Sequence, residues 1–246
     1  MKNEKIIEAV THFKSLLNVT EKEQFKAAFE MFTADGVTPE KISGGTAAHF
    51  LAALEVAARS ELSAETAKKA GRGAVKKALE KMLKTGAAHY PHQTYLKKAA
   101  TVDGCQLVCD GVRIFRLYNA VELSPEYVSS DENNAEKLQD LYLKIVNGSK
   151  ENKTELLTVP AASELDALIK AGKAEKRAAK DRTPVLYDFG DGLPAVNAEY
   201  LRDVLTVYGE GIEISAGVSP LSPLYFSGDA GDGIICPVRK AARATA

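Results

Sequence analysis

The chain has 246 residues, 45% of them hydrophobic, which is enough to bury a core in one large domain or two small ones. Charged residues make up 26% and nearly cancel to a formal net charge of -1, so the chain as a whole has no electrostatic bias toward nucleic acid or anionic membranes. No apolar stretch reaches the roughly 18 residues of a spanning helix, and the first residues, MKNEKIIEAV, are charged where a secretion signal is apolar. We therefore expect a soluble, cytoplasmic protein.

The first third of the chain is predicted to be helical. Apolar residues at helical spacing mark a first helix, at Ile6, Ile7, Val10, Phe13, Leu16 and Leu17. Thr20 and Glu23 have the spacing of a capping box for a second helix, whose buried face is Phe25, Ala28, Phe29 and Phe32. A third helix is expected over 46–59 and a fourth over 63–84, with Gly71 and Gly73 bending or splitting the fourth.

The rest of the chain mixes strands and helices. Short β-type runs separated by Asp-Gly pairs predict a meander over 94–102, 106–109 and 112–118. Helical spacing follows over 134–146, then a polar loop over 147–153, a strand over 156–159 and a helix that begins at Ser163. A strand over 183–189, a helix capped by Asn197 and three strands over 211–215, 223–227 and 233–238 complete the chain. The fold class is therefore α+β, and no internal repeat is evident.

Three cysteines, Cys105, Cys109 and Cys236, lack the paired spacing of a zinc site and leave one thiol over in any disulfide scheme. We expect reduced thiols, with Cys105 and Cys109 on one face of a strand as small buried hydrophobes. We expect neither a metal nor a cofactor.

Four short motifs suggest chemistry but favour a plain structural interpretation. His89 and His92 lack a third ligand, so surface histidines are expected, and Asp188-Phe189-Gly190 matches a kinase tripeptide without the other kinase motifs. The glycine-rich segment 228–233 lacks the closing Glu of a calcium loop, and 43–46 lacks the lysine of a P-loop. These segments predict a strand end, a hairpin and a helix start. The chain is accordingly not expected to be an enzyme, and a deep polar pocket near the histidines would revive the enzyme alternative.

The fourth helix carries a local excess of cations. Its positive residues, which outnumber Glu65 and Glu80, are Lys68, Lys69, Arg72, Lys76, Lys77, Lys81 and Lys84. Contacts to a nucleic-acid backbone need such a cluster, although a solvated helix face has the same composition. The DNA-binding candidates are Lys68, Lys69, Arg72, Lys76, Lys77 and Lys81.

The C-terminal stretch NAEYLRDVLTVYGEGIEISAGVSPLSPLYFSGDAGDGIICPVR resembles the end of the bacterial DNA polymerase III beta subunit, the sliding clamp. The landmarks that carry the resemblance are Asn197, Ala198, Tyr200, Leu201, Ser222, Pro223, Pro237 and Arg239. The segment VCDGVRIFRL is similar to the clamp motif Thr-Asp-Gly-His-Arg-Leu and retains Asp110, Gly111 and Arg113. It departs from the motif at Cys109, Val112 and Ile114, which replace threonine, histidine and leucine.

The resemblance implies a domain built from a helix, a strand meander, a second helix and a second meander. We therefore predict a helical N-terminal region over 1–62 and a single clamp-like domain over 63–246, with a helical insertion near 130–182. In this domain the helix that begins at Asn197 packs through Tyr200, Leu201, Val204 and Leu205. A clamp chain has three such domains, so this chain is not expected to encircle DNA by the family's usual dimeric ring.

The resemblance also implies a function. It indicates a non-enzymatic accessory or scaffolding protein, of the kind found in phages and mobile elements, that binds partner proteins. Weak DNA binding through Lys76, Lys77 and Lys81 is a further expectation. The alternative is a structural or interaction protein that uses the clamp fold without a DNA role. By likeness to clamps, the peptide-binding candidates are Cys109, Gly111, Val112, Arg113 and Ile114 together with Ile234, Cys236 and Pro237.

The two halves of this candidate pocket are expected to meet only when two copies associate head to tail. Replacing Arg113 with alanine is then expected to weaken peptide binding without unfolding the protein. Under the alternative interpretation, both segments are simply core strands.

Overall fold

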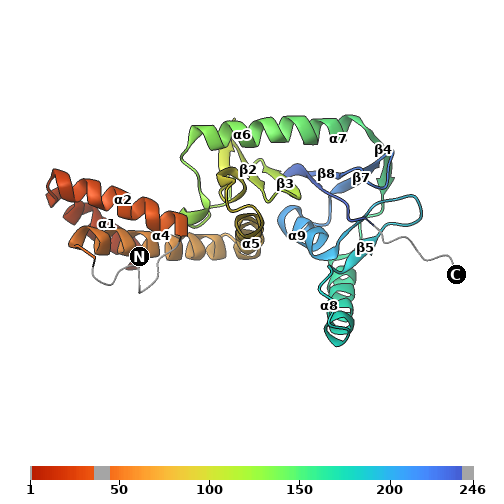
Figure 1. Cartoon of the computed structure of the whole chain (residues 1–246), viewed down its shortest axis with the longest axis horizontal. Helices are drawn as coiled ribbons and strands as arrows, with labels where there is room; N and C mark the ends of the chain where they lie inside the picture. The colour runs from red at the N-terminus through yellow and green to blue at the C-terminus, as the bar shows by residue number, and fades with distance from the viewer. Residues whose placement is uncertain (1, 36–44, 240–246) are drawn as a thin grey trace. The chain divides into compact units, whose positions relative to one another are not determined.

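A computed structural model describes residues 2–35 and 45–239 (Figure 1). The chain forms two compact units, a helical unit made of residues 1–80 and 121–130 and a sheet unit made of residues 81–120 and 131–246. The fold class is α+β, as the sequence predicts. The division lies at residue 80, whereas the sequence analysis placed it at residue 62, and the segment 121–130 returns to the helical unit. Of the segment 43–46, predicted to be a helix start, residues 43 and 44 lie outside the described residues, and a helix begins directly after it at Ala47, with Thr46 as its N-cap.

Three long helices build the helical unit: α1 (Lys2–Leu16), α2 (Val19–Asp35) and α4 (Ala47–Lys69). The unit also contains the first half of α5 (Gly73–His89) and the short 3-10 turn η2 (Pro125–Tyr127). Both α1 and α2 pack against α4. The core between them consists of Val10, Phe25, Ala28, Phe32, Ala48, Ala52, Ala53 and Val56. Small alanine side chains on α4 let the helix backbones approach closely.

The start of α2 differs from the expected capping box. The N–H of Glu21 donates to Oδ1 of Asn18 at 2.9 Å, and the N–H of Asn18 donates to Oε2 of Glu21 at 2.9 Å. This reciprocal pair is a capping box two residues before the expected Thr20 and Glu23. The predicted stripe of α1 is only partly buried, because Phe13 and Leu16 are 54% and 68% exposed.

The split predicted at Gly71 and Gly73 is confirmed, but the break expected between residues 59 and 63 is absent. Helix α4 continues unbroken through residues 60–63 and ends at Lys69. The N–H of Arg72 donates to the carbonyl of Ala67 at 2.7 Å, and the N–H of Gly71 donates to that of Lys68 at 3.1 Å. Gly71 has a φ of +70°, so these bonds form a Schellman termination that favours glycine. The predicted third and fourth helices are therefore divided at this glycine and not near residue 60.

The sheet unit contains a seven-stranded antiparallel sheet in the order β1-β2-β3-β9-β8-β7-β4. Its strands are β1 (Ala100–Val102), β2 (Cys105–Cys109), β3 (Arg113–Leu117), β4 (Lys153–Leu157), β7 (Glu213–Gly217), β8 (Leu224–Gly228) and β9 (Gly231–Ile235). A second, two-stranded sheet pairs β5 (Leu186–Asp188) with β6 (Ala195–Asn197). The glycine-rich segment 228–233 is a hairpin between β8 and β9, as predicted.

The sheet has the order of elements that the resemblance implies, and its two halves match in topology although no internal repeat is evident in the sequence. Helix α5 precedes the meander β1-β2-β3, and helix α9 (Ala198–Tyr208) precedes the meander β7-β8-β9. The last strands of the two meanders, β3 and β9, pair antiparallel at the centre of the sheet. Each half of the sheet therefore consists of one helix followed by three strands. The two halves have the same topology and meet at the β3–β9 pair, as in an approximate two-fold repeat.

Helices cover both faces of the sheet (Figure 1). On one face lies a continuous helical rod made of α6 (Glu132–Tyr142), the π-helical turn η3 (Leu143–Asn147) and α7 (Gly148–Glu151). Its core with the strands includes Leu107, Ile114, Leu138, Val146 and Ile234. On the other face α9 packs through Leu201, Val204 and Leu205, which are buried as predicted, while Tyr200 is half-buried. There the ring of Tyr208 contacts the rings of Phe115 and Phe226.

Several boundaries around the predicted insertion differ from expectation. The segment 147–153 was predicted to be a polar loop, but the helical rod continues to Glu151, and β4 begins at Lys153 instead of residue 156. Helix α8 (Ala162–Ala178) has Ala161 as its N-cap, with no side-chain cap bond, and Ser163 lies in its first turn. Residues 94–96 form the 3-10 turn η1 (Thr94–Leu96), so β1 is shorter than predicted.

Candidate functional site

Lys76, a central DNA-binding candidate, is buried. Its ammonium group lies 2.8 Å from Oγ of Ser63, 3.0 Å from Oγ of Ser124 and 2.7 Å from Oε1 of Glu80. These partners come from α4, α5 and the segment 121–130, all within the helical unit. Because its ammonium group is occupied by these partners, Lys76 anchors the segment 121–130 to the helical unit and is not available to phosphates. Its assignment to a DNA-binding surface is therefore corrected.

The other cationic candidates do not form one surface within one unit. Lys68, Lys69 and Lys77 are exposed in the helical unit, where Arg72 is half-buried. Lys81 belongs to the sheet unit, and its ammonium lies 3.7 Å from Glu199 and 3.8 Å from Asp203 on α9. The carboxylates of α9 therefore already neutralise the cation that was expected to face a duplex.

The Asp110-Gly111-Val112-Arg113 segment is a closed structural motif. The side chain of Arg113 is fully buried and donates from Nε and Nη2 to Oδ2 of Asp110, at 3.0 and 2.8 Å. Oδ1 of Asp110 accepts the N–H groups of Val112 and Arg113 at 3.0 and 2.7 Å. Nη1 of Arg113 reaches Asp203 at 2.8 Å, and the guanidinium lies 4.0 Å from the ring centroid of Tyr200. With its polar groups occupied internally, Arg113 is not presented to a peptide.

The two halves of the predicted peptide pocket lie side by side in one chain. Strand β3 pairs with β9, with Ile114 opposite Ile234, and the N–H of Cys236 donates to the carbonyl of Val112 at 2.9 Å. The expectation that they meet only through a second copy is therefore wrong. Cys109, Ile114 and Ile234 are core residues, as the alternative interpretation holds. Gly111 is exposed, while Val112, Cys236 and Pro237 are half-buried.

The remaining sequence motifs have structural roles. His89 and His92 are both exposed. Asp188 ends β5, and its Oδ1 accepts the N–H of Gly190 at 3.0 Å, which is the predicted strand end entering a turn. Within residues 2–35 and 45–239, no group of three His, Cys, Asp or Glu side chains is arranged to hold a metal ion.

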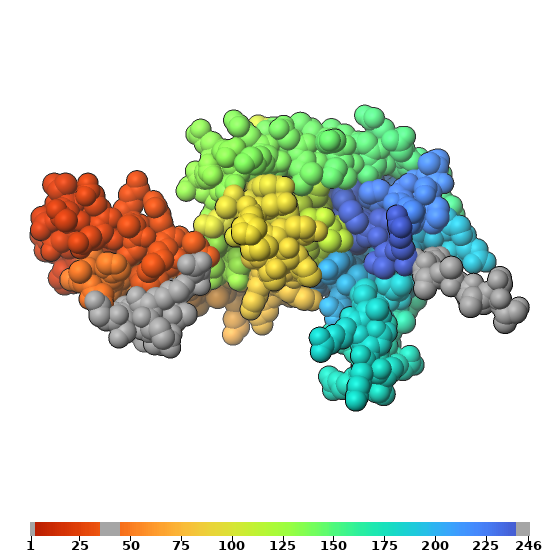
Figure 2. Space-filling model, viewed as in Figure 1, coloured from red at the N-terminus to blue at the C-terminus, as the bar shows by residue number. Residues whose placement is uncertain are grey.

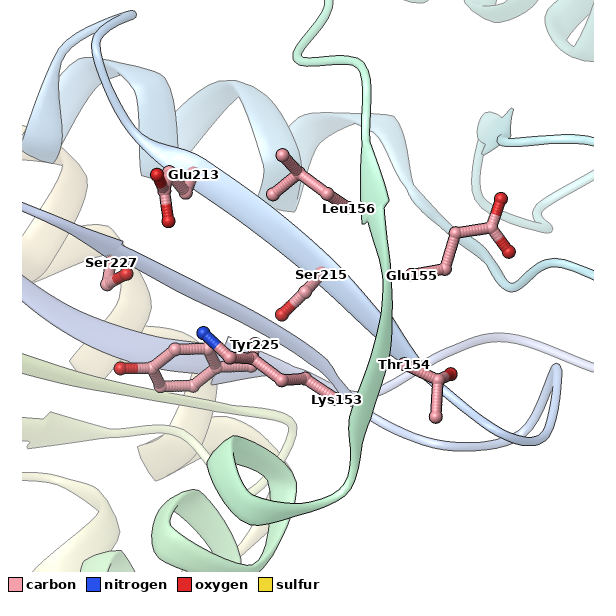
Figure 3. Close-up of a pocket in the computed structure, with 8 residues that line it drawn as sticks. All are labelled: Lys153, Thr154, Glu155, Leu156, Glu213, Ser215, Tyr225 and Ser227. Carbon is pink, nitrogen blue, oxygen red and sulfur yellow. The ribbon is translucent and has the colours of Figure 1, made fainter.

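A groove that the sequence analysis missed lies over β4, β7 and β8 (Figure 3). It has a volume of about 310 Å³. Its floor includes Ser215 and Tyr225, which are 6% and 4% exposed, and Lys153 places its amine over the Tyr225 ring, 6.0 Å from the centroid. Leu156 of β4 is 69% exposed at the border, and Glu213 of β7 also lines the groove.

A buried polar cluster fixes the floor of this groove. Asp232 of β9 accepts bonds from Arg116 at 3.0 and 2.7 Å, from the hydroxyl of Tyr142 at 3.0 Å and from that of Tyr225 at 3.4 Å. Burial raises the pKa values of Tyr142 and Tyr225, so both hydroxyls are neutral donors near pH 7. The cluster ties the end of α6 and the Tyr225 ring to the centre of the sheet.

Strand β4 is the edge of the seven-stranded sheet beside the groove. No strand in the described part of the chain pairs with its outer side, so main-chain donors and acceptors are available there. The groove adds an apolar side chain, a cation and an anion in Leu156, Lys153 and Glu213. An extended peptide can use all of these groups, because β-augmentation combines main-chain bonds with alternate side-chain contacts. The edge position is a property of the topology, and no local pattern in the sequence reveals it.

Within the described residues, no helix is long and apolar enough to cross a membrane. Comparison with known proteins found no matching family model, no similar curated protein and no similar solved structure. The resemblance to the sliding clamp therefore stays a prediction.

Proposed function

We propose that this chain is a non-enzymatic scaffolding protein that captures an extended segment of a partner protein along strand β4. The observation that carries the proposal is the combination of an unpaired sheet edge, the exposed Leu156 and a groove of about 310 Å³ with a fixed aromatic floor. In this proposal the partner segment adds as a strand beside β4, and its side chains contact Leu156 and the Tyr225 ring.

The order of elements supports a clamp-like scaffold. The sheet unit contains a helix, a meander, a second helix and a second meander, with α6, η3, α7, β4 and α8 inserted between the halves. This order is the one that the resemblance to clamp domains implies. Strand β4 lies in the inserted segment. The proposed binding edge therefore belongs to the insertion and not to the clamp-like order of elements. The binding site is accordingly moved from the Asp110–Arg113 segment to this edge.

The charges of the groove indicate the kind of segment that fits. Lys153 and Glu213 place opposite charges at the groove, and Leu156 supplies apolar surface. In Figure 3 Leu156 points over β7, while Glu155 points away from Tyr225 and Ser215. The preferred partner is thus an extended segment that alternates apolar and charged residues, with an acidic residue near Lys153.

Selection from a random-peptide display library, with the whole chain immobilised, tests this function. A selected peptide is then synthesised with a fluorescent label, and its dissociation constant is measured by anisotropy. Replacing Leu156 with Asp, or Lys153 with Glu, should weaken binding about tenfold or more, which corresponds to roughly 1.4 kcal/mol. Val218→Asp is the matched control, because Val218 is 82% exposed and does not line the groove.

Amide hydrogen exchange gives a second readout. Bound peptide should slow exchange in β4, because outward amides of an edge strand gain partners in β-augmentation. The proposal is defeated if a peptide binds the Leu156→Asp and Val218→Asp variants equally well and does not slow amide exchange in β4. The binding site would then lie elsewhere.

Duplex DNA is a second candidate ligand, and the exposed Lys68, Lys69 and Lys77 of the helical unit favour it. Such binding would be weak, independent of sequence and abolished by salt, since it rests on phosphate contacts alone. Titration of labelled duplex at low and moderate salt tests it. Binding that is unchanged when all three lysines are replaced with alanine would remove this candidate.

A further inference from the structure

A second groove in the sheet unit is lined by the C-terminal half of α8, the segment 181–185 and the first residues of α9. Its volume is about 310 Å³. Figure 2 shows α8 (cyan) standing out from the surface of the sheet unit. This groove shares no lining residue with the groove over β4, so the two sites can be tested independently.

Positive side chains outnumber negative ones in this second groove. Its cations are Lys173, Lys176, Arg177 and Arg182, and its carboxylates are Asp181 and Glu199. This excess is local, because the chain as a whole carries a formal net charge of -1. A concave site with a net excess of positive charge attracts anions.

Internal ion pairs use the lysines and leave the arginines open. The ammonium of Lys176 lies 2.9 Å from Oδ2 of Asp181, and that of Lys173 pairs with Glu199. Both carboxylates of the groove are therefore matched by lysines. Arg177 and Arg182 are exposed, and neither forms an ion pair with any residue that the structure describes. Two guanidinium groups are thus available to an anion.

The walls of the groove are fixed by short contacts. Asp181 accepts the N–H and the hydroxyl of Thr183, both at 2.8 Å, which holds the turn after α8. A Cβ added to Gly172 would lie 2.8 Å from the methyl groups of Val185, so α8 packs closely on this segment. The N–H of Ala198 donates to the carbonyl of Val185 at 2.9 Å and joins the segment to α9. The backbone that lines the groove is therefore held in place.

The arginines indicate the chemical class of the ligand. A planar guanidinium matches phosphate oxygens with two parallel bonds and stays charged at every physiological pH. The groove is also lined by Asn197 and Glu199 at the start of α9, where the helix dipole favours an anion. We propose that this groove binds phosphate oxygens of a ligand that carries at least two negative charges in total, either a small phosphorylated molecule or a nucleic-acid strand.

Isothermal titration of the full chain with inorganic pyrophosphate, at low salt, tests the proposal. Saturable binding is expected, and the double variant Arg177→Gln/Arg182→Gln should lose about tenfold or more in affinity, as two charge-assisted interactions are removed. The single variant Arg182→Gln should show an intermediate loss. Circular dichroism melts should stay unchanged, because both side chains are exposed.

Lys170→Gln is the matched control, since Lys170 is exposed on the same helix, carries the same charge and does not line the groove. It should bind pyrophosphate within about twofold of the unmodified chain. Competition with a short oligothymidylate separates the two sources: displacement of pyrophosphate indicates a nucleic-acid strand, and no displacement indicates a small phosphorylated molecule. Absence of saturable pyrophosphate binding, or an equal loss in the Lys170→Gln variant, overturns the proposal.

Discussion

Arg113 and Asp110 form an ion pair with both side chains fully excluded from solvent, Nη2 lying 2.8 Å from Oδ2. The pair closes the loop between β2 and β3, and Arg113 continues to Asp203 on α9 at 2.8 Å. A short sequence match that resembles a peptide-binding motif thus serves here to hold the loop and a helix together.

Replacing Arg113 with alanine should destabilise the sheet unit by about 3–5 kcal/mol, because it leaves the carboxylate of Asp110 buried without its partner. Urea denaturation followed by circular dichroism measures the effect. Arg113→Lys should recover part of the loss, because it keeps the charge but not the paired N–H groups. If the alanine variant has the stability of the unmodified chain, the structural role of this arginine is refuted.

Lys76 and Lys77 are neighbours in the sequence, but Lys76 is buried, with 5% of its surface exposed, whereas Lys77 is exposed to solvent. Lys76→Met should destabilise the helical unit by about 1–3 kcal/mol, because it leaves Glu80 and Ser124 without their shared donor. Lys77→Met should change stability by less than about 0.5 kcal/mol. Thermal unfolding of the two variants gives the comparison, and equal melting temperatures would contradict the buried network.

The three cysteines should react with iodoacetamide in a fixed order. Burial raises the pKa of Cys109 to about 12 and also raises that of Cys236, so both thiols carry little thiolate near pH 8. Cys105 is half-buried and should be alkylated first, while Cys109 should react only after denaturation. Mass spectrometry of timed digests measures the order. Early labelling of Cys109 in the folded protein would show that β2 is not in the core.

Asp181 should titrate far below an ordinary aspartate. The N–H of Thr183 lowers the pKa of Asp181 to about 2, with further contributions from the side chains of Lys176 and Thr183. Because the folded pKa is below the unfolded value of about 3.9, its contribution to stability is fully present above that pH. It is lost as the pH falls toward 2.

An NMR titration of the Asp181 carboxyl carbon measures this pKa. Thr183→Val should raise the pKa, because it removes the hydroxyl donor and keeps the backbone N–H, whereas Thr183→Ser should leave it low. A midpoint near 3.9 in the unmodified chain would mean that the turn after α8 is not formed in solution.

Local patterns in the sequence determined the class of the fold and many of its elements. Helical spacing located α2 through Phe25, Ala28 and Phe32, because residues three and four apart share a helix face whatever they pack against. Asn197 marked the start of α9, since an Asn cap satisfies free N–H groups within its own turn. The Asp-Gly pairs marked the turns between β1, β2 and β3 for the same local reason.

Only the tertiary structure decided which side chains are available for function. Lys76 and Lys77 look alike in the sequence, but the returning segment with Ser124 buries the first. Leu156 sits on an edge because β4 joins the sheet beside β7, a strand some sixty residues later in the chain. The pairing of β3 with β9 brought the two halves of the predicted pocket side by side in one chain. Burial and strand order depend on contacts between segments far apart in sequence, which periodicity and capping do not encode.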